Sequence, residues 1–305
     1  MPDKGLWLPR PPVRWALALL LTGLLTLVSA PGDGLPPLAL TAGVVVAAAR
    51  LLPARHAGLV ALGGFVATMA VYRVIGFPLS NSGLLALGAV LGALAVAALL
   101  AVVRIRRISS LLDLFVFGCA TVAVSAVGAT VLATVIPAEA ARWPFWWVSL
   151  CLGIALPAPG MLDVTEWQVP RGTRRRLEAI VLTGLIAVVT LLAANTASGL
   201  VPGRPAYALP PLLLWFGLRF GLRAVSAVAT VVGAVLIGGE LRSGWAAASQ
   251  AQWSAHLLTV GATVAGILLI YAVALLEGKR RAGERQLQAS QDFVRSLLDN
   301  SPALV

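Results

Sequence analysis

Two charged residues at the ends of apolar segments, Asp113 and Arg219, are the first candidates for chemistry in this chain of 305 residues. An acid and a base at the same membrane face can meet as an ion pair within a helical bundle. A charge at the bilayer centre costs about 2.5 to 3.5 kcal/mol on insertion scales, whereas one near the boundary reaches water cheaply. Both interpretations therefore stay open, an ion pair or two separate side chains that extend to water, and we favour the second.

A cluster of tryptophans forms a second candidate site. Trp146 and Trp147 stand beside Trp143 at the start of an apolar segment. Indole rings suit the boundary between lipid and water, so we interpret the cluster as an aromatic anchor among the head groups. The alternative is an aromatic wall that faces a ligand.

Residue sets typical of a catalytic or metal site are missing from the sequence. It holds no carboxylate pair, no nucleophile with a base, no glycine-rich phosphate loop and no metal-spaced set of His and Cys. An ion-coupled carrier commonly places carboxylates or histidines in mid-span. Here the acids, His56 and His256 lie in connections, near segment ends or in the tails. We therefore expect no enzyme activity, no cofactor and no metal in this chain.

Ten apolar segments would have to position the candidate residues. With 59% hydrophobic and 11% charged residues, the chain has more apolar surface than a soluble core needs. A membrane helix needs about 17 to 25 apolar residues, which four segments reach, and a fifth reaches with a kink expected at Pro157 and Pro159. The segments are 15–30, 35–49, 57–72, 83–103, 114–136, 144–162, 179–198, 205–218, 224–239 and 254–276.

The second and eighth segments are short enough to be re-entrant or interfacial. The sequence therefore predicts an all-α, polytopic transmembrane bundle of ten spans, with eight spans as the alternative. Within the bundle, Gly88 and Gly92 form a small-xxx-small step that predicts a close helix contact.

The positions of Lys and Arg predict the orientation of this bundle. If the N-terminus is inside, all but four of the 23 basic residues lie in inner connections or tails; the four are Arg73, Arg142, Arg204 and Arg242. Basic residues near span ends stay in the cytoplasm, so both termini are predicted to be cytoplasmic. The net charge of +11 is spread over these loop ends. We therefore expect a lipid bilayer with anionic lipids as the partner, and no nucleic acid.

The chain turns polar after the tenth segment, from Glu277 to Asp299. Residues with spacings of seven, four, three, four and three lie on one helix face and form a largely apolar stripe, namely Leu276, Gly283, Leu287, Ser290, Val294 and Leu297. Gly278 and Gly283 weaken this helix by about 1 kcal/mol each relative to alanine. We expect a continuous but soft signalling helix. Its two possible arrangements are a parallel coiled coil in a homodimer and a basic helix on acidic lipid.

The stretch from Leu209 to Gly221 resembles part of the type-one membrane-associated sensor (MASE) domain, together with Trp146-Trp147 and with Pro157 to Pro159. The resemblance covers roughly residues 12–278. Its most specific part is Leu214-Trp215 followed by Leu218-Arg219-Phe220-Gly221, and Arg107 with Asp113 resembles the family's basic-then-acidic start of a span. The family usually has a Gly-Asp pair after the double tryptophan, whereas this chain has Ser149 and Leu150.

This resemblance implies a role for the chain. The family forms integral membrane input domains of bacterial sensor kinases and diguanylate cyclases. We therefore expect a sensory input module in a bacterial inner membrane, with an unknown stimulus ligand. Sensing or coupling would depend on Asp113, Trp146, Trp147, Trp215 and Arg219.

The tail carries a second resemblance. Residues 290–305 are similar to the opening helix and first strand of a PAS domain, so we expect a fragment of a longer protein. The output of that protein would be a histidine kinase, a diguanylate cyclase or a phosphodiesterase. The expected organisation is a tail at 1–11, a membrane sensor domain at 12–277, a signalling-helix linker at 278–289 and the start of a PAS domain at 290–305.

A small transporter or channel component is the alternative function. Its polar pathway would use hydroxyl and amide side chains in the apolar segments, namely Thr121, Ser125, Thr130, Thr134, Thr183, Thr190 and Asn195. The continuation of the reading frame beyond Val305 distinguishes the two functions, because PAS and output modules there would favour sensing.

Reporter fusions test the predicted orientation. A fusion at Arg175 and a fusion at the C-terminus should both report the cytoplasm, with alkaline phosphatase inactive and green fluorescent protein fluorescent. A result that places the two sites on opposite faces of the membrane would overturn the topology.

Overall fold

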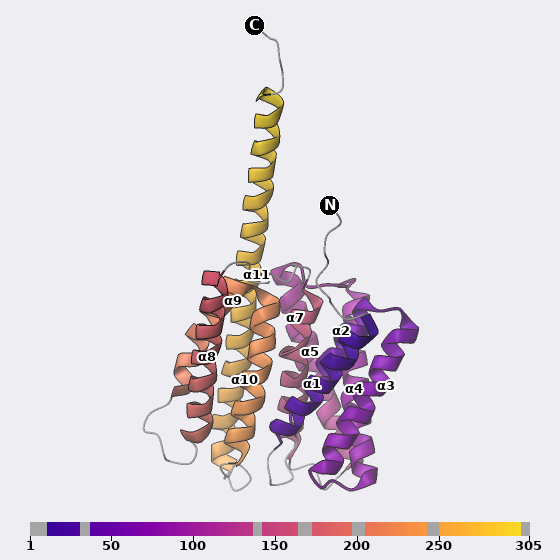
Figure 1. The fold of residues 1–305 in the computed structure, drawn as a ribbon. Helices are drawn as coiled ribbons and strands as arrows, with labels where there is room; N and C mark the ends of the chain where they lie inside the picture. Colours follow the sequence, from indigo (N-terminus) through magenta and orange to yellow (C-terminus); the bar gives the residue numbers. More distant parts are fainter. Residues whose placement is uncertain are drawn as a thin grey trace.

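The computed structural model describes residues 11–30, 37–136, 142–163, 173–196, 205–242 and 250–299. Over these residues the chain is almost entirely helical, without a β-strand. Figure 1 shows an upright bundle from which one helix, α11, projects far beyond the others. The helices are α1 (Pro11–Val28), α2 (Leu40–Leu51), α3 (Ala54–Val74), α4 (Leu79–Val102), α5 (Leu111–Val135), α6 (Trp143–Ala155), α7 (Ala158–Leu162), α8 (Thr173–Thr196), the 3-10 turn η2 (Pro205–Ala208), α9 (Leu209–Phe220), α10 (Leu222–Arg242) and α11 (Gln250–Asp299).

Several of these helices have the length and surface of membrane helices. Among the described residues, five are long and apolar enough to cross a membrane, namely α3, α4, α5, α6 together with α7, and α8. Their outward side chains are large and apolar, as at Leu59, Leu112 and Ile180. A helix that is apolar on all sides is covered either by protein or by lipid. The all-α fold class is therefore confirmed, with the features of a membrane protein.

Helix α2 lies inside the bundle. Every side chain from Leu40 to Ala48 is buried, and α2 packs against α1, α3, α4, α6 and α7. An interfacial helix would expose one face to head groups, so the interfacial interpretation of this segment is wrong. Because its neighbours cover it, α2 needs no long apolar surface of its own against lipid.

Two glycines allow the close approach of α2 and α6. A Cβ atom on Gly153 would lie 2.5 Å from the Ala39 carbonyl oxygen, and one on Gly43 would collide with the Pro157 ring. The small-xxx-small motif predicted on α4, Gly88 and Gly92, makes a less close helix contact than the α2–α6 crossing. A Cβ on Gly88 would lie 3.1 Å from the Leu132 side chain, whereas Gly92 faces open space. The prediction is thus confirmed for Gly88 and wrong for Gly92.

The kink predicted in the sixth apolar segment is an interruption of the helix, since α6 ends at Ala155 and α7 begins at Ala158. In an uninterrupted helix the Leu156 carbonyl would accept from the Gly160 N–H. Instead, the hydroxyl of Ser226 on α10 lies between them, donating to Leu156 O at 2.5 Å and accepting from Gly160 N at 3.2 Å. Tyr271 of α11 also donates to Leu156 O, at 2.9 Å. Side chains of α10 and α11 therefore complete the broken helix.

The predicted tail helix is confirmed as well. Helix α11 runs without interruption from Gln250 to Asp299, through Gly278 and Gly283. Residues 1–10 of the expected tail and the first strand of the expected PAS domain lie outside the described residues.

The close approach of α2 and α6 at Gly153 can be tested by its effect on stability. Gly153→Ala should destabilise the protein by about 1–3 kcal/mol, because the new methyl group would overlap backbone that cannot move away. Gly92→Ala is the matched control, since its methyl group meets open space. Thermal unfolding in detergent, followed by size-exclusion chromatography, measures both variants. Equal losses in the two variants would contradict the close approach.

Candidate functional site

The strongest candidate site is the place where α11 leaves the bundle, which we call the exit junction. It comprises Glu178 of α8, Leu218 and Arg219 of α9, and Glu277 and Arg281 of α11. Before it, Tyr271, Ala274 and Leu275 are buried in the bundle, and after it the side chains from Ala282 to Leu297 are exposed. Figure 1 shows α11 continuing alone from this point.

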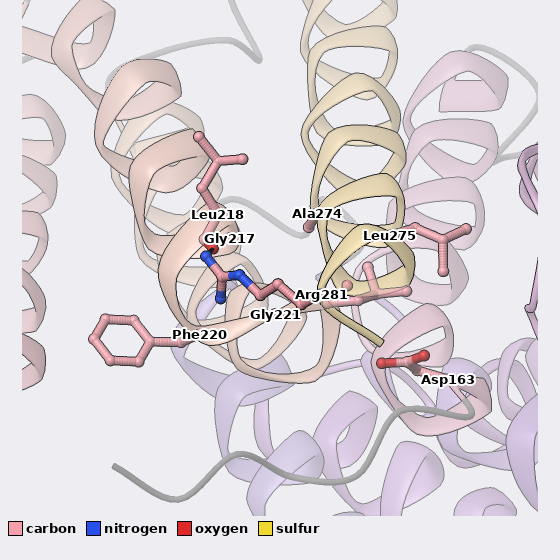
Figure 2. Close-up of a pocket in the computed structure, with 10 residues that line it drawn as sticks. Asp163, Gly217, Leu218, Phe220, Gly221, Ala274, Leu275 and Arg281 are labelled. Atoms are coloured by element: carbon pink, nitrogen blue, oxygen red, sulfur yellow. Dashed lines mark hydrogen bonds between the residues drawn. The ribbon is translucent and has the colours of Figure 1, made fainter. Parts of the chain in front are cut away.

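Arg281 joins α11 to the last turn of α9. Its guanidinium group donates to Leu218 O at 2.5 Å and to Arg219 O at 3.3 Å. The last four carbonyls of a helix lack partners within it, and a cation there also suits the helix dipole. Glu277, one turn earlier, accepts from Arg281 Nε at 2.9 Å and orients the side chain. Arg281 therefore caps α9 from a neighbouring helix, as Figure 2 shows.

Glycines determine the shape of this end of α9. Gly221 has a φ of +87°, which favours glycine, and its N–H donates to Gly217 O at 2.9 Å. Gly217 lies against α11, since a Cβ there would be 3.2 Å from the Ala274 Cβ. The two helices therefore touch through small residues next to Arg281.

Arg219 forms a two-pronged ion pair with Glu178 of α8. The Nε–Oε1 distance is 2.6 Å and the second guanidinium nitrogen lies 3.0 Å from Oε2. The Arg219 side chain is 44% exposed and that of Glu178 is 24% exposed. Arg219 thus connects α8 to the residues that Arg281 caps.

The pair between Asp113 and Arg219 is not formed, and Asp113 does not simply extend to water. Its Oδ2 atom accepts from the backbone N–H and hydroxyl of Ser109 at 2.9 Å and from the Ser110 N–H at 2.8 Å. Ser110 in turn accepts from the Asp113 N–H, which completes a capping box at the start of α5. Asp113 is therefore held by donors from Ser109 and Ser110, and Arg219 pairs with Glu178 instead.

The tryptophans lie apart from the exit junction. Trp146 is 1% exposed and packs against Tyr72 and Phe77, with ring centroids 6.0 and 6.4 Å away. The anchor interpretation is therefore wrong for Trp146, which fills the interior between α3 and α6. Trp147 stacks on Trp143 and donates from Nε1 to Val122 O at 3.2 Å.

Trp215 has a different environment from the other tryptophans. It is 56% exposed on α9, whereas its neighbours Phe216 and Gly217 are buried. Of the five predicted candidate residues, only Arg219 belongs to the exit junction. The anchor interpretation of Trp147 stays a prediction.

A cavity of about 20 Å³ lies within the junction, lined by residues that include Asp163, Gly221 and Arg281 (Figure 2). This volume holds about one water molecule. Sites for small ligands measure about 300–1,000 Å³, so the junction has no room for such a ligand. Within the described ranges, no group of three or more His, Cys, Asp and Glu side chains could hold a metal ion. The arrangement is suited to mechanical contact between helices.

Sequence reasoning missed five side chains that form contacts here, namely Glu178, Glu277 and Arg281 at the junction and Ser226 and Tyr271 at the helix break. Only Glu277 and Arg281 have a local signal, because they stand four residues apart, the spacing of an ion pair on one helix. Comparisons with protein-family models, with curated proteins and with solved structures found no match. The function is therefore inferred from the geometry of the chain itself.

The cap that Arg281 provides is testable. Arg281→Gln should loosen the end of α9, because hydrogen bonds from a charged group contribute about 1.5–3 kcal/mol. Hydrogen–deuterium exchange of the amides in the α9–α10 turn should accelerate about tenfold or more, since 1.4 kcal/mol is a factor of ten. Arg285→Gln, on the exposed part of α11, should leave this exchange unchanged. Unchanged exchange in Arg281→Gln would show that the cap is unimportant.

Proposed function

We propose that this chain is the membrane-embedded sensory input module of a bacterial signal-transduction protein. The observation that carries the proposal is the 50-residue helix α11, which packs inside the bundle and continues as one element well beyond it. A rigid helix that is anchored in a membrane bundle can pass a displacement to whatever follows it. In this proposal a kinase, cyclase or phosphodiesterase output follows through a PAS domain.

Two contacts would couple the bundle to α11. Tyr271 bonds to the helix break at Leu156, and Arg281 bonds to the end of α9. They stand ten residues apart on α11, about 15 Å along its axis. A stimulus that changes the packing at either level would shift or rotate the helix. Such signalling needs two packings that differ by only a few kcal/mol and that the stimulus favours unequally.

The exposed part of α11 supports a dimeric module. Leu287, Val294 and Leu297 are 61%, 51% and 55% exposed. Burying such side chains is favourable by about 1.5–3 kcal/mol each. With Ser290 they follow spacings of three, four and three, the repeat of a parallel coiled coil. We therefore propose that a second copy of α11 covers this stripe.

We further propose ten membrane crossings, with both termini in the cytoplasm. Figure 1 supports this orientation, because α1 starts and α11 leaves at the same end of the bundle. Three arginines form hydrogen bonds at this end. Arg50 donates to Ile105 O, Arg219 donates to the Glu178 carboxylate, and Arg223 donates to Asp163 O. Lys and Arg near span ends favour the cytoplasm. Short α2 counts as a crossing because neighbouring helices cover it. Short α9 counts as one because the 3-10 turn η2 extends it at its start.

The alternative of a transporter or channel has less support. Thr121 and Ser125 are buried on one side of α5, whereas Thr130 and Thr134 are exposed on another side. Thr130, Thr134 and Asn195 bond to carbonyls of their own helices. Polar side chains on different helix faces do not form one pathway.

Insertions that change the helical phase of α11 test the proposal. Inserting one alanine after Ala289 in the full-length protein should rotate everything beyond it by about 100° and change the basal output activity severalfold. Inserting seven residues at the same place keeps the heptad phase and should preserve the output. The kinase or cyclase activity of membranes that hold equal amounts of each variant measures the effect. If the single insertion leaves the kinase or cyclase activity unchanged, or if both insertions lower it equally, transmission through α11 is refuted.

A further inference from the structure

A groove between α8 and α10 has the size of a ligand site on the outer surface of the bundle. Its volume is about 370 Å³, within the range of about 300–1,000 Å³ that ligand sites occupy. Five residues of α8 between Thr183 and Leu191 and five of α10 between Ala227 and Val235 line it. The small side chains of Ala187 and Ala227, both exposed, leave the hollow between the two helices.

The lining of the groove suits hydrocarbon. All of its residues are alanine, valine, leucine or isoleucine except Thr183 and Thr190. The Thr190 hydroxyl donates to Ile186 O of its own helix at 2.6 Å, so it needs no partner in the groove. A polar ligand would lose its hydrogen bonds with water here, whereas an acyl chain would lose none.

One end of the groove is electropositive. Arg176 stands seven residues before Thr183, about two helical turns, and therefore on the same face of α8. Helices α8 and α10 both start at this end, and helix N-termini favour anions. Glu178, the nearby acid on α8, faces α9 and is paired with Arg219. The groove therefore offers a basic head and an apolar body.

We propose that the groove binds an acyl chain of an anionic phospholipid whose phosphate interacts with Arg176. The chemistry of the site matches such an amphiphile at both ends, with hydrocarbon against the alanines and valines and negative charge at the start of α8. The inference does not depend on a sensory role, because any membrane protein can hold a lipid in this way.

Charge favours a lipid over a second copy of the chain in this groove. Two copies related by a two-fold axis would present the same surface to each other. That arrangement would bring together the first turns of both α8 helices, each with Arg174, Arg175 and Arg176. Like charges at such a contact disfavour it, whereas a phosphate neutralises them.

Native mass spectrometry of the purified chain tests the proposal with phosphatidylglycerol and phosphatidylcholine as probes. The chain should retain one phosphatidylglycerol in preference to phosphatidylcholine. Arg176→Gln should lower the phosphatidylglycerol affinity about fivefold, the contribution expected of one arginine near anionic lipid, with little effect on phosphatidylcholine. The double variant Ala187→Phe, Ala227→Phe should fill the groove and abolish retention of this lipid.

Two matched controls separate the groove from general effects. Arg174→Gln removes the same charge from the opposite face of α8, and Ala98→Phe adds the same ring to an exposed position on α4. Both controls should retain phosphatidylglycerol as the unchanged protein does, and all variants should show the same helical circular dichroism. Equal affinity in Arg176→Gln, unchanged retention after the groove is filled, or a dimer that only the groove-filling variant disrupts would overturn the proposal.

Discussion

The need to satisfy backbone hydrogen bonds without water is the constraint on which this structure depends. Away from water, a carbonyl that no helix partner reaches must find another donor. Leu156 O at the proline break is such a carbonyl, and Leu218 O, at the partly exposed end of α9, also lacks a partner within its own helix. Helix α11 supplies a donor to each, from Tyr271 and Arg281. The longest helix of the chain is therefore tied to the bundle at the two places where other helices end.

Close packing through small residues complements these hydrogen bonds. Association of helices in lipid depends on van der Waals contact, because lipid is as apolar as the helix surfaces. Gly43 and Gly153 bring α2 against α6, and Gly217 brings α9 against α11. The result is a bundle in which neighbouring helices bury α2 from Leu40 to Ala48, and in which small residues and one arginine hold the place where α11 leaves.

The two proposals meet on the first turns of α8. Arg176 heads the groove, and Glu178, two residues later, pairs with Arg219 at the exit junction. These side chains lie on different faces of α8, so one helix end contributes to both sites. The lipid groove and the coupling role nevertheless rest on separate observations, the groove lining in one case and the continuity of α11 in the other.

The sequence by itself determined the features that depend on local order. Hydropathy predicted a helical membrane protein, Pro157 and Pro159 predicted a distortion of the sixth segment, and the stripe after Leu276 predicted the tail helix, because each signal lies within a few turns of chain. Only the tertiary structure decided the partners. Arg219 pairs with Glu178, 41 residues away, and Tyr271 reaches Leu156, 115 residues away. Likewise Trp146 faces the interior, because the rotation of each helix about its axis depends on how its neighbours pack, and hydropathy that is apolar on every side does not specify that rotation.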